Sequence, residues 1–447
     1  MHLVTEPPAA DPRTRRLLVG FAIASLGTGL TVPFLFVHLA RVRDLGAGTA
    51  GLLYAWMGLV GILAALAAGP LLDRRGSRPV LLGALGVGAS ALTCLALLPL
   101  DAGVGVMLPV LAGVVLGAAP LWPATTALLA RWAGPHAAVR DRLLAQAFLA
   151  LNAGIGVGSV LGALVVDVDR AGTFRLLFLG QAATCLVFAL IVIGGGAGGG
   201  DAGPDPDPSR RPGTAAASAP EAEAGWSVVL ADRRMLLLCG CGVLAVTFGY
   251  GQIEAGATAY AVEVAGVPAA ALGWAFAANT LVVLLAQLPV LRWVGAWRRT
   301  SALGLAVALW SVAWVVVAAA DPLGGLGAAP AIAALVVGLA VFGLGETLWA
   351  PVAAALADDL ATDATRGRHH AALGLVWTLG QMLGPAIAGL LIGSGHGHLW
   401  ALLVVAATAV TAVLLRRFRR LLRPEEDGVP SAAASASSAD PVVTVAR

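Results

Sequence analysis

Long apolar runs separated by short polar breaks repeat along nearly the whole chain. A helix needs roughly 20 apolar residues to cross the hydrocarbon core of a bilayer. Twelve runs reach about that length, and they lie at residues 17–38, 49–72, 79–99, 104–130, 143–166, 174–194, 235–260, 270–291, 300–319, 329–356, 370–393 and 397–415. The pattern therefore predicts an all-α polytopic membrane protein with twelve transmembrane helices.

The composition is consistent with a lipid bilayer as the solvent of these runs. Of the 447 residues, 59% are hydrophobic and 12% are charged, and the mean hydropathy is +0.87. A soluble domain usually has about a quarter of its residues charged. A soluble fold could not bury so much apolar surface. The first run is too long for the core of a cleaved signal peptide, so we expect it to remain as an anchor.

The basic residues predict the orientation. All 28 are Arg, and loops rich in basic residues stay on the cytoplasmic side of a membrane. With the N-terminus inside, 24 of the 28 fall in cytoplasmic segments, and only Arg41, Arg43, Arg170 and Arg175 fall outside. We therefore predict a multi-pass protein of the cell membrane whose N- and C-termini are both cytoplasmic.

Two segments lack helical periodicity and separate the spans into groups. Residues 195–234 are rich in Gly, Pro, Ala and Asp, a composition typical of flexible linkers, and the C-terminal segment is similar. The predicted organisation is a cytoplasmic N-terminus (1–16), an N-terminal six-helix bundle (17–194), a cytoplasmic flexible linker (195–234), a C-terminal six-helix bundle (235–417) and a cytoplasmic disordered tail (418–447).

The two groups of six spans resemble each other. At an offset of 222 residues, four glycines of the first group fall on glycines of the second; at an offset of 226, further glycines and two arginines do so. The pairs are Gly20–Gly242, Gly27–Gly249, Gly29–Gly251, Gly51–Gly273, Gly117–Gly343, Arg140–Arg366, Arg142–Arg368, Gly154–Gly380 and Gly158–Gly384. We expect two pseudo-symmetric bundles that enclose a site near the middle of the membrane.

The loop between the second and third spans, residues 69–82, reads GPLLDRRGSRPVLL. It is similar to the signature G-x-L-a-D-r-x-G-r-k-x-x-l of the major facilitator superfamily of transporters. The motif residues are Gly69, Leu71, Asp73, Arg74, Gly76, Arg78 and Leu81, while Ser77 stands where a basic residue is usual. The resemblance implies a conformational latch between the bundles. The alternative is a solvated loop that only sets the topology.

The resemblance extends to the proton-coupled drug exporters with twelve spans. Residues 345–392 are similar to their tenth and eleventh spans. Their fifth-span motif g-x-x-x-G-P-x-x-G-G is partly present as Gly154, Gly158 and Gly162, but Ser159 and Ala163 depart from it. Gly380, Gly384 and Pro385 supply a similar element in the eleventh span. The Arg that such exporters usually carry in the fourth span is missing.

Two carboxylates interrupt the apolar spans, Glu254 in the seventh and Glu346 in the tenth. Ionisable residues within a membrane are costly and mark functional sites by default. Burial favours the neutral form, so either carboxyl could carry a coupling proton. We place both in a cavity for protons and substrate, with the polar residues Tyr250, Asn279 and Gln381 and the aromatic residues Trp349 and Trp377. The alternative is that each Glu is protonated and only joins neighbouring helices.

The seventh span is also expected to bend or to separate into two segments. Gly249, Gly251 and Gly256 surround Tyr250 and Glu254, and Tyr250 precedes Glu254 by four residues, which places both on one face of a continuous helix.

These features favour a secondary transporter that works by alternating access, and most of all a proton-coupled exporter (antiporter) of amphipathic small molecules. The alternative is a proton symporter or uniporter that takes up a sugar or another small polar solute. An enzyme is not expected, since no catalytic set, nucleotide loop or metal-spaced His/Cys cluster is present. We predict no cofactor, no metal and no nucleic-acid partner. The resemblance also implies a monomer.

Overall fold

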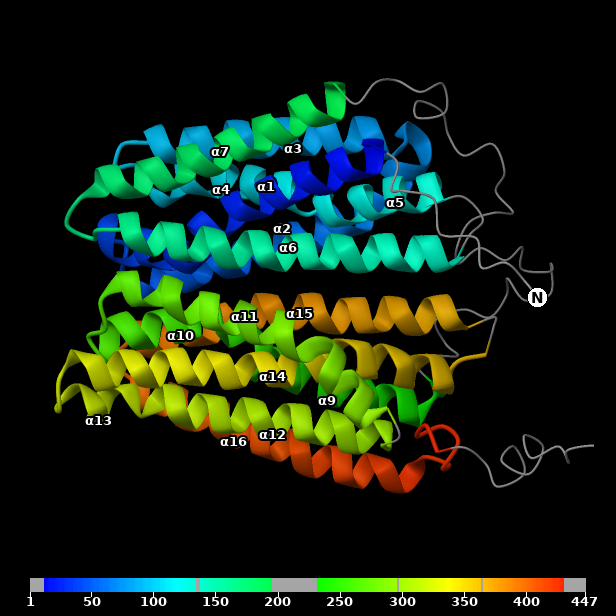
Figure 1. The fold of residues 1–447 in the computed structure, drawn as a ribbon. Helices are drawn as coiled ribbons and strands as arrows, with labels where there is room; N and C mark the ends of the chain where they lie inside the picture. Colours follow the sequence, from blue (N-terminus) through cyan, green and yellow to red (C-terminus); the bar gives the residue numbers. More distant parts are fainter. Residues whose placement is uncertain (1–11, 134–136, 195–230, 296, 363–364, 430–447) are drawn as a thin grey trace, which may run out of the picture.

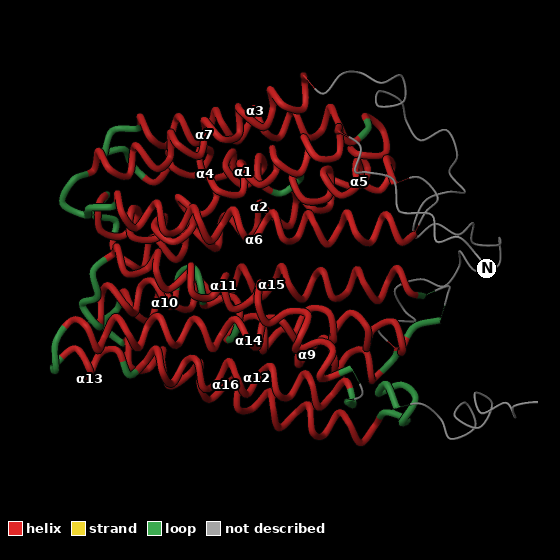
Figure 2. Tube along the Cα trace, viewed as in Figure 1, coloured by secondary structure: helices red, strands yellow, loops and turns green. Residues whose placement is uncertain are grey.

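Helices joined by short connections make up the described chain almost throughout (Figure 2). The computed structural model describes residues 12–133, 137–194, 231–295, 297–362 and 365–429. Among these residues, twelve helices are long and apolar enough to cross a membrane. The predicted all-α class with twelve spans is confirmed.

The two halves lie side by side in Figure 1, with α1 to α7 above and α9 to α16 below. The N-terminal half contains α1 (Pro12–Val37) with the π-helix η1 (His38–Val42), α2 (Gly46–Arg75), α3 (Ser77–Leu97), α4 (Val104–Ala118), α5 (Leu121–Ala133), α6 (Ala137–Val165) and α7 (Ala171–Gly194). The fourth predicted span is thus divided into α4 and α5. Helices α1 and α6 form the most extensive contact in this half.

The C-terminal half follows the same order of long helices. It contains α9 (Arg233–Phe248), the 3-10 helix η3 (Tyr250–Gln252), α10 (Gly256–Ala259), the π-helix η4 (Tyr260–Val264), α11 (Ala269–Val294), α12 (Arg299–Ala318), α13 (Ala320–Gly324), α14 (Ala328–Leu360), α15 (Arg366–Gly393), α16 (Gly397–Phe418) and the 3-10 helix η5 (Arg419–Leu421). We call the end where α1 begins and α16 ends, on the right of Figure 1, the arginine-rich end.

Glycines allow equivalent helices to cross closely in both halves. In the first half, a Cβ added at Gly158 of α6 would lie 2.0 Å from the Leu26 carbonyl oxygen of α1. In the second, a Cβ at Gly384 of α15 would lie 2.8 Å from the Gly251 carbonyl oxygen. Gly158 and Gly384 are a predicted pair of the repeat. Such close approach of backbones is how small residues join helices in lipid.

The halves contact each other toward the end opposite to the arginine-rich end. Helix α2 meets α15 where a Cβ at Gly51 would lie 2.6 Å from the Gly389 Cα. Helix α6 meets α11 where a Cβ at Gly273 would lie 2.3 Å from the Ser159 carbonyl oxygen. Both contacts lie in the parts of these helices remote from the arginine-rich end. The structure thus holds the halves together at the opposite end.

The seventh span parts where its glycines predict. Helix α9 ends at Phe248, and Gly249 leaves the helical conformation with φ −96° and ψ −87°. A Cβ at Gly249 would also lie 2.5 Å from the Trp310 ring. The chain resumes as η3, a turn and the single turn α10. Tyr250 and Glu254 are therefore not on one face of a regular helix, and the predicted four-residue relationship is wrong.

The disordered tail predicted from residue 418 is wrong for residues 418–429, whereas residues 430–447 lie outside the described part. Helix α16 includes Phe418, and the next residues fold back against the N-terminus of α12. The Asp427 carboxylate is fully buried and accepts hydrogen bonds from the Thr300 amide at 2.8 Å and the Thr300 hydroxyl at 2.9 Å. Arg234 donates to Glu426 at 2.5 Å. An acidic side chain at the start of a helix satisfies free amides, which fixes this segment.

The substitution Asp427→Ala should lower the stability of the folded protein by about 1–3 kcal/mol, because it leaves the buried amide and hydroxyl of Thr300 without an acceptor. Thermal unfolding of the purified protein in detergent measures this. Glu425→Ala is the matched control, since Glu425 is exposed in the same segment. Equal unfolding temperatures for the two variants would contradict the role of Asp427.

Candidate functional site

Glu346 is the centre of a polar cluster built from three spans. The Tyr250 hydroxyl of η3 donates to Glu346 Oε1 at 3.2 Å, and Asn279 Nδ2 of α11 donates to Glu346 Oε2 at 3.4 Å. Glu346 itself lies on α14 and is half-buried. Asn279 also donates to the Leu339 carbonyl at 3.3 Å, which holds its amide in place. The structure thus brings three of the predicted cavity residues together.

An aromatic wall surrounds this cluster. The Tyr250 ring lies 4.5 Å from the Trp377 ring of α15, measured between centroids. Trp310 of α12 stacks on Phe342 at 5.3 Å and contacts Trp349 at 5.5 Å. Trp310 and Phe342 are fully buried and were not predicted from the sequence, because a buried aromatic residue in an apolar run carries no signal of what it contacts.

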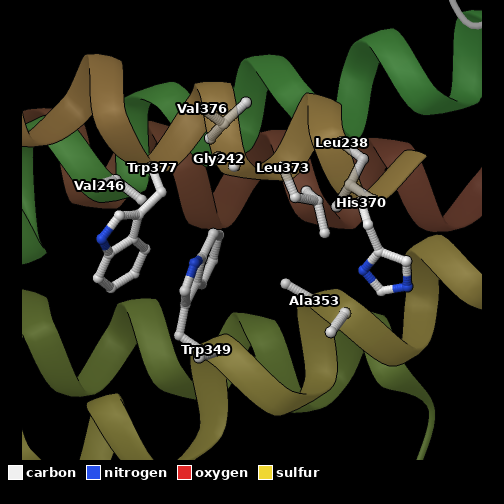
Figure 3. A pocket seen from close by; sticks show the side chains of 12 residues that line it. Leu238, Gly242, Val246, Trp349, Ala353, His370, Leu373, Val376 and Trp377 are labelled. Carbon is white, nitrogen blue, oxygen red and sulfur yellow. The ribbon is translucent and has the colours of Figure 1, made fainter. Parts of the chain in front are cut away.

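A pocket lies between α9, α14 and α15, with Trp349 and Trp377 at one end and His370 at the other (Figure 3). It has a volume of about 210 Å³. The lining side chains are Leu238, Gly242, Val246, Trp349, Ala350, Ala353, Ala354, His370, Leu373, Gly374, Val376 and Trp377. Of these residues, Trp377 contacts the Tyr250 ring, and Trp349 follows Glu346 by nearly one turn of α14. The pocket therefore reaches close to the polar cluster, and its lining is apolar except for His370.

Glu254 lies in the turn between η3 and α10 and is half-buried. Its carboxylate makes no hydrogen bond to the described residues, but it interacts electrostatically with Tyr250 and with Tyr54 of α2. Tyr54 belongs to the other half and is 6% exposed. Helix α10, which begins two residues after Glu254, contacts α1 of the other half, whereas Glu346 makes its hydrogen bonds within the C-terminal half. Tyr54 was not predicted, since only the folded chain places it beside span seven.

Gln381 is not part of the Glu346 cluster; it is half-buried on α15. A different glutamine, Gln252, was missed by the sequence analysis. Its amide donates to the carbonyls of Thr247 at 2.8 Å and Gly384 at 3.2 Å, and its oxygen accepts from Trp400 Nε1 at 2.8 Å. These bonds join the break of span seven to α15 and α16.

The predicted glycine motifs form helix contacts and do not line the pocket. Gly154 and Gly158 meet α1, and a Cβ at Gly162 would lie 2.5 Å from the Phe34 ring. A Cβ added at Gly380 would meet the Val246 side chain of α9, and a Cβ added at Gly51 of α2 would meet the Pro385 carbonyl oxygen. The last contact crosses between the halves.

The motif of the predicted latch is only partly described. The surroundings of Gly69 and the side chain of Asp73 lie outside the described part. Arg74 is exposed, and Gly76 ends α2 with φ 80°, a conformation that suits glycine. Arg78 donates at 3.2 Å to the carbonyls of Val192 and Ile193 at the end of α7, in its own half. A latch between the halves at this loop remains a prediction.

In the part of the chain that the structure describes, no three His, Cys, Asp or Glu side chains gather closely enough to hold a metal ion. The site is instead a carboxyl group, its two hydrogen-bond donors and an adjoining aromatic pocket, held in a bundle of twelve apolar helices. Twelve helices of this length and hydropathy define a multi-pass membrane protein, and this cluster with its pocket is its candidate site.

The sequence comparison gives the family. The pattern of the Major Facilitator Superfamily matches residues 17–271 and 255–446, so the chain belongs to this superfamily of transporters, whose members are not enzymes. No curated protein sequence matches the chain.

Solved structures confirm the fold. A point mutant of the nucleoside transporter NupG superposes with a TM-score of 0.70 at 13% identity, covering 92% of this chain and 100% of that chain. An auto-inhibited POT family peptide transporter has a TM-score of 0.70 at 15% identity, covering 95% and 100%. A bacterial homolog of the human lysosomal transporter Spinster, inward-facing and unoccupied, has a TM-score of 0.66 at 14% identity. This match covers 95% of this chain and 100% of that chain. At these identities the likeness concerns the fold alone, and the drug exporter branch stays a prediction.

Proposed function

We propose that this protein is a proton-driven exporter of amphipathic small molecules that works by alternating access, as a monomer in the cell membrane with both termini in the cytoplasm. The observation that carries the proposal is an aromatic, apolar pocket whose Trp377 contacts Tyr250, the residue that donates a hydrogen bond to the Glu346 carboxyl group of the tenth span. The aromatic walls suit the apolar part of a substrate, and the carboxyl suits a proton or a positive charge.

The chemistry of Glu346 supports exchange of a proton for substrate. Tyr250 and Asn279 donate to its two oxygens, so both oxygens of the carboxylate have a hydrogen-bond donor among the described residues when the proton has left. A proton that enters from the outside neutralises the carboxylate and removes its attraction for a bound cationic group. Loss of that proton to the cytoplasm restores the attraction. One site would then bind substrate and proton alternately, and the proton gradient would drive export.

Uptake of a polar solute is the competing function. Uptake of an anion would favour an Arg in the pocket, and none is among its described lining residues. A sugar would favour more amide and hydroxyl groups than this lining offers. The pocket therefore favours an amphipathic substrate.

The test uses everted membrane vesicles acidified inside, a lumenal pH dye and a panel of cationic and neutral lipophilic compounds. Vesicles without the protein are the control. We expect at least one compound to make the lumen more alkaline only when the protein is present. If none does so while a polar solute accumulates in whole cells, the exporter proposal falls and uptake replaces it.

The loop motif gives a further prediction. Asp73→Asn should lower the transport rate about tenfold without lowering the amount of protein in the membrane, because the superfamily signature implies a latch that uses this carboxylate, and an interaction with a charged group contributes about 1.5–3 kcal/mol. The measurement is vesicle transport normalised to protein abundance, with Asp169→Asn, in the loop between α6 and α7, as the control. Unchanged transport would leave the loop only its topological role.

A further inference from the structure

The end of the bundle opposite to the arginine-rich end carries two π-helices, η1 in one half and η4 in the other. Their positions differ by the 222 residues of the sequence repeat. Each ends with the same backbone hydrogen bond: the Arg43 amide donates to the His38 carbonyl at 2.9 Å, and the Ala265 amide donates to the Tyr260 carbonyl at 3.0 Å. The two π-helices are therefore equivalent elements of the two halves.

Each π-helix is attached to its own half. Arg43, at the end of η1, donates to the carbonyls of Leu98 and Pro99 beyond α3, both at 3.0 Å. The Tyr260 hydroxyl of η4 donates to the Ala318 carbonyl at the end of α12, also at 3.0 Å. Ring contacts to α7 in one half and to α16 in the other add a second attachment. Each π-helix should thus move together with its half.

An ion pair joins these two elements across the halves. Arg41 Nε of η1 lies 2.5 Å from Glu263 Oε1 of η4, and Arg41 Nη2 donates to the Val262 carbonyl at 3.2 Å. Arg41 and Glu263 occupy equivalent positions in the repeat and carry opposite charges, so symmetry brings them face to face. We infer that Arg41 and Glu263, the gate pair, are positioning residues of the transport cycle: they hold this end closed and separate when it opens.

The expected effect is moderate. The Arg41 side chain is 45% exposed and that of Glu263 is 25% exposed, so water and salt screen the pair. Breaking it should change the ratio of open to closed states by about threefold to fivefold. Charge reversal places like charges opposite each other, so it should change the ratio of open to closed states by an amount in the upper part of this range.

Thr258 of α10 provides a reporter of opening. It is fully buried, and its hydroxyl has no hydrogen-bond partner, so Thr258→Cys costs little. Gly256 faces Trp400 of its own half. Helix α10, which carries Thr258, also contacts α1 of the other half. In a chain whose four cysteines are replaced by Ala, a membrane-impermeant maleimide added from outside should label Thr258→Cys only when this end opens.

Charge reversal tests the gate pair. Arg41→Glu and Glu263→Arg should each raise the labelling rate about threefold to fivefold, and the double exchange should return it to the parental rate. Arg41→Gln should act in the same direction with a smaller effect. The control is Arg170→Glu, which breaks an ion pair with Asp167 at the same end but within one half, and should change nothing. Protein abundance in the membrane is measured for every variant.

The inference would be overturned if the single variants are labelled at the parental rate. It would also be overturned if the double exchange is labelled as fast as the single variants. It rests on the alternating access proposed above, but the labelling needs neither substrate nor a proton gradient. A negative labelling result would therefore overturn the gate pair alone. If no compound changes the lumenal pH in the vesicle assay, but the double exchange restores the parental labelling rate, the exporter proposal is wrong and the role of the gate pair still holds.

Discussion

Glu346→Gln is expected to reduce compound-driven alkalinisation of everted vesicles to the background of vesicles without the protein. Glutamine has the size of glutamate, and its amide oxygen can still accept a hydrogen bond from Tyr250 or Asn279, so the fold should be retained. What is lost is the group that takes up and releases a proton. The measurement is the lumenal pH change per amount of protein, with the compound found active in the panel.

Glu254→Gln is the informative companion variant, because Glu254 is the second carboxyl group within the spans, lies next to α10 and is outside the Glu346 cluster. Glu425→Gln, an exposed change in the C-terminal segment, is the control. If Glu346→Gln retains the parental proton movement and Glu254→Gln loses it, the coupling group is Glu254. If neither variant has an effect, proton coupling through these carboxyls is wrong.

Gly158→Val should destabilise the folded protein by about 3 kcal/mol or more, because its Cβ would lie 2.0 Å from the Leu26 carbonyl oxygen and backbone cannot move aside cheaply. Unfolding of the purified protein in detergent, followed by tryptophan fluorescence, measures the loss, which should appear as a lower midpoint temperature and a smaller folded fraction. Gly384→Val, the equivalent change in the other half, should act in the same way.

The matched control is Gly86→Val in α3, where an added Cβ meets nothing within 4 Å. Gly86→Val also places a β-branched residue in a helix, so it has the same intrinsic cost as Gly158→Val. The difference in stability between the two variants therefore measures the effect of the crossing of α1 and α6. Equal stabilities for Gly158→Val and Gly86→Val would show that the helices can separate without cost, against the close crossing described here.

The apolar runs were sufficient to predict the number of spans and their class, because in a membrane the length and hydropathy of a segment decide its structure almost locally. The glycines around Tyr250 predicted that span seven parts. They could not predict the geometry of the break, which depends on Trp310 and α15. Nor could the apolar runs predict that His38 and His369, which lie near the ends of their helices, are only 3% and 2% exposed.

The candidate site was predicted as separate residues and not as an arrangement. Glu346, Tyr250 and Asn279 are far apart along the chain, and only the packing of α14, η3 and α11 joins them. Gln381 had the same chemical character and was predicted on the same grounds, yet it lies outside the cluster. Polar character within a span identifies candidates, whereas the direction of each side chain depends on how helices rotate against their neighbours.

The hydrogen bonds of Gln252 bear on how span seven takes part in motion. A helix that parts within lipid exposes carbonyls that water cannot reach, and this normally drives the helix to re-form. Here the Gln252 amide donates hydrogen bonds to the Thr247 and Gly384 carbonyls, and the Gln252 side-chain oxygen accepts one from Trp400. We therefore expect the interruption to persist as a fixed bend and not to close into a continuous helix. The angle between α9 and α10 should be conserved throughout turnover, so Glu254 and Tyr250 travel as one rigid piece.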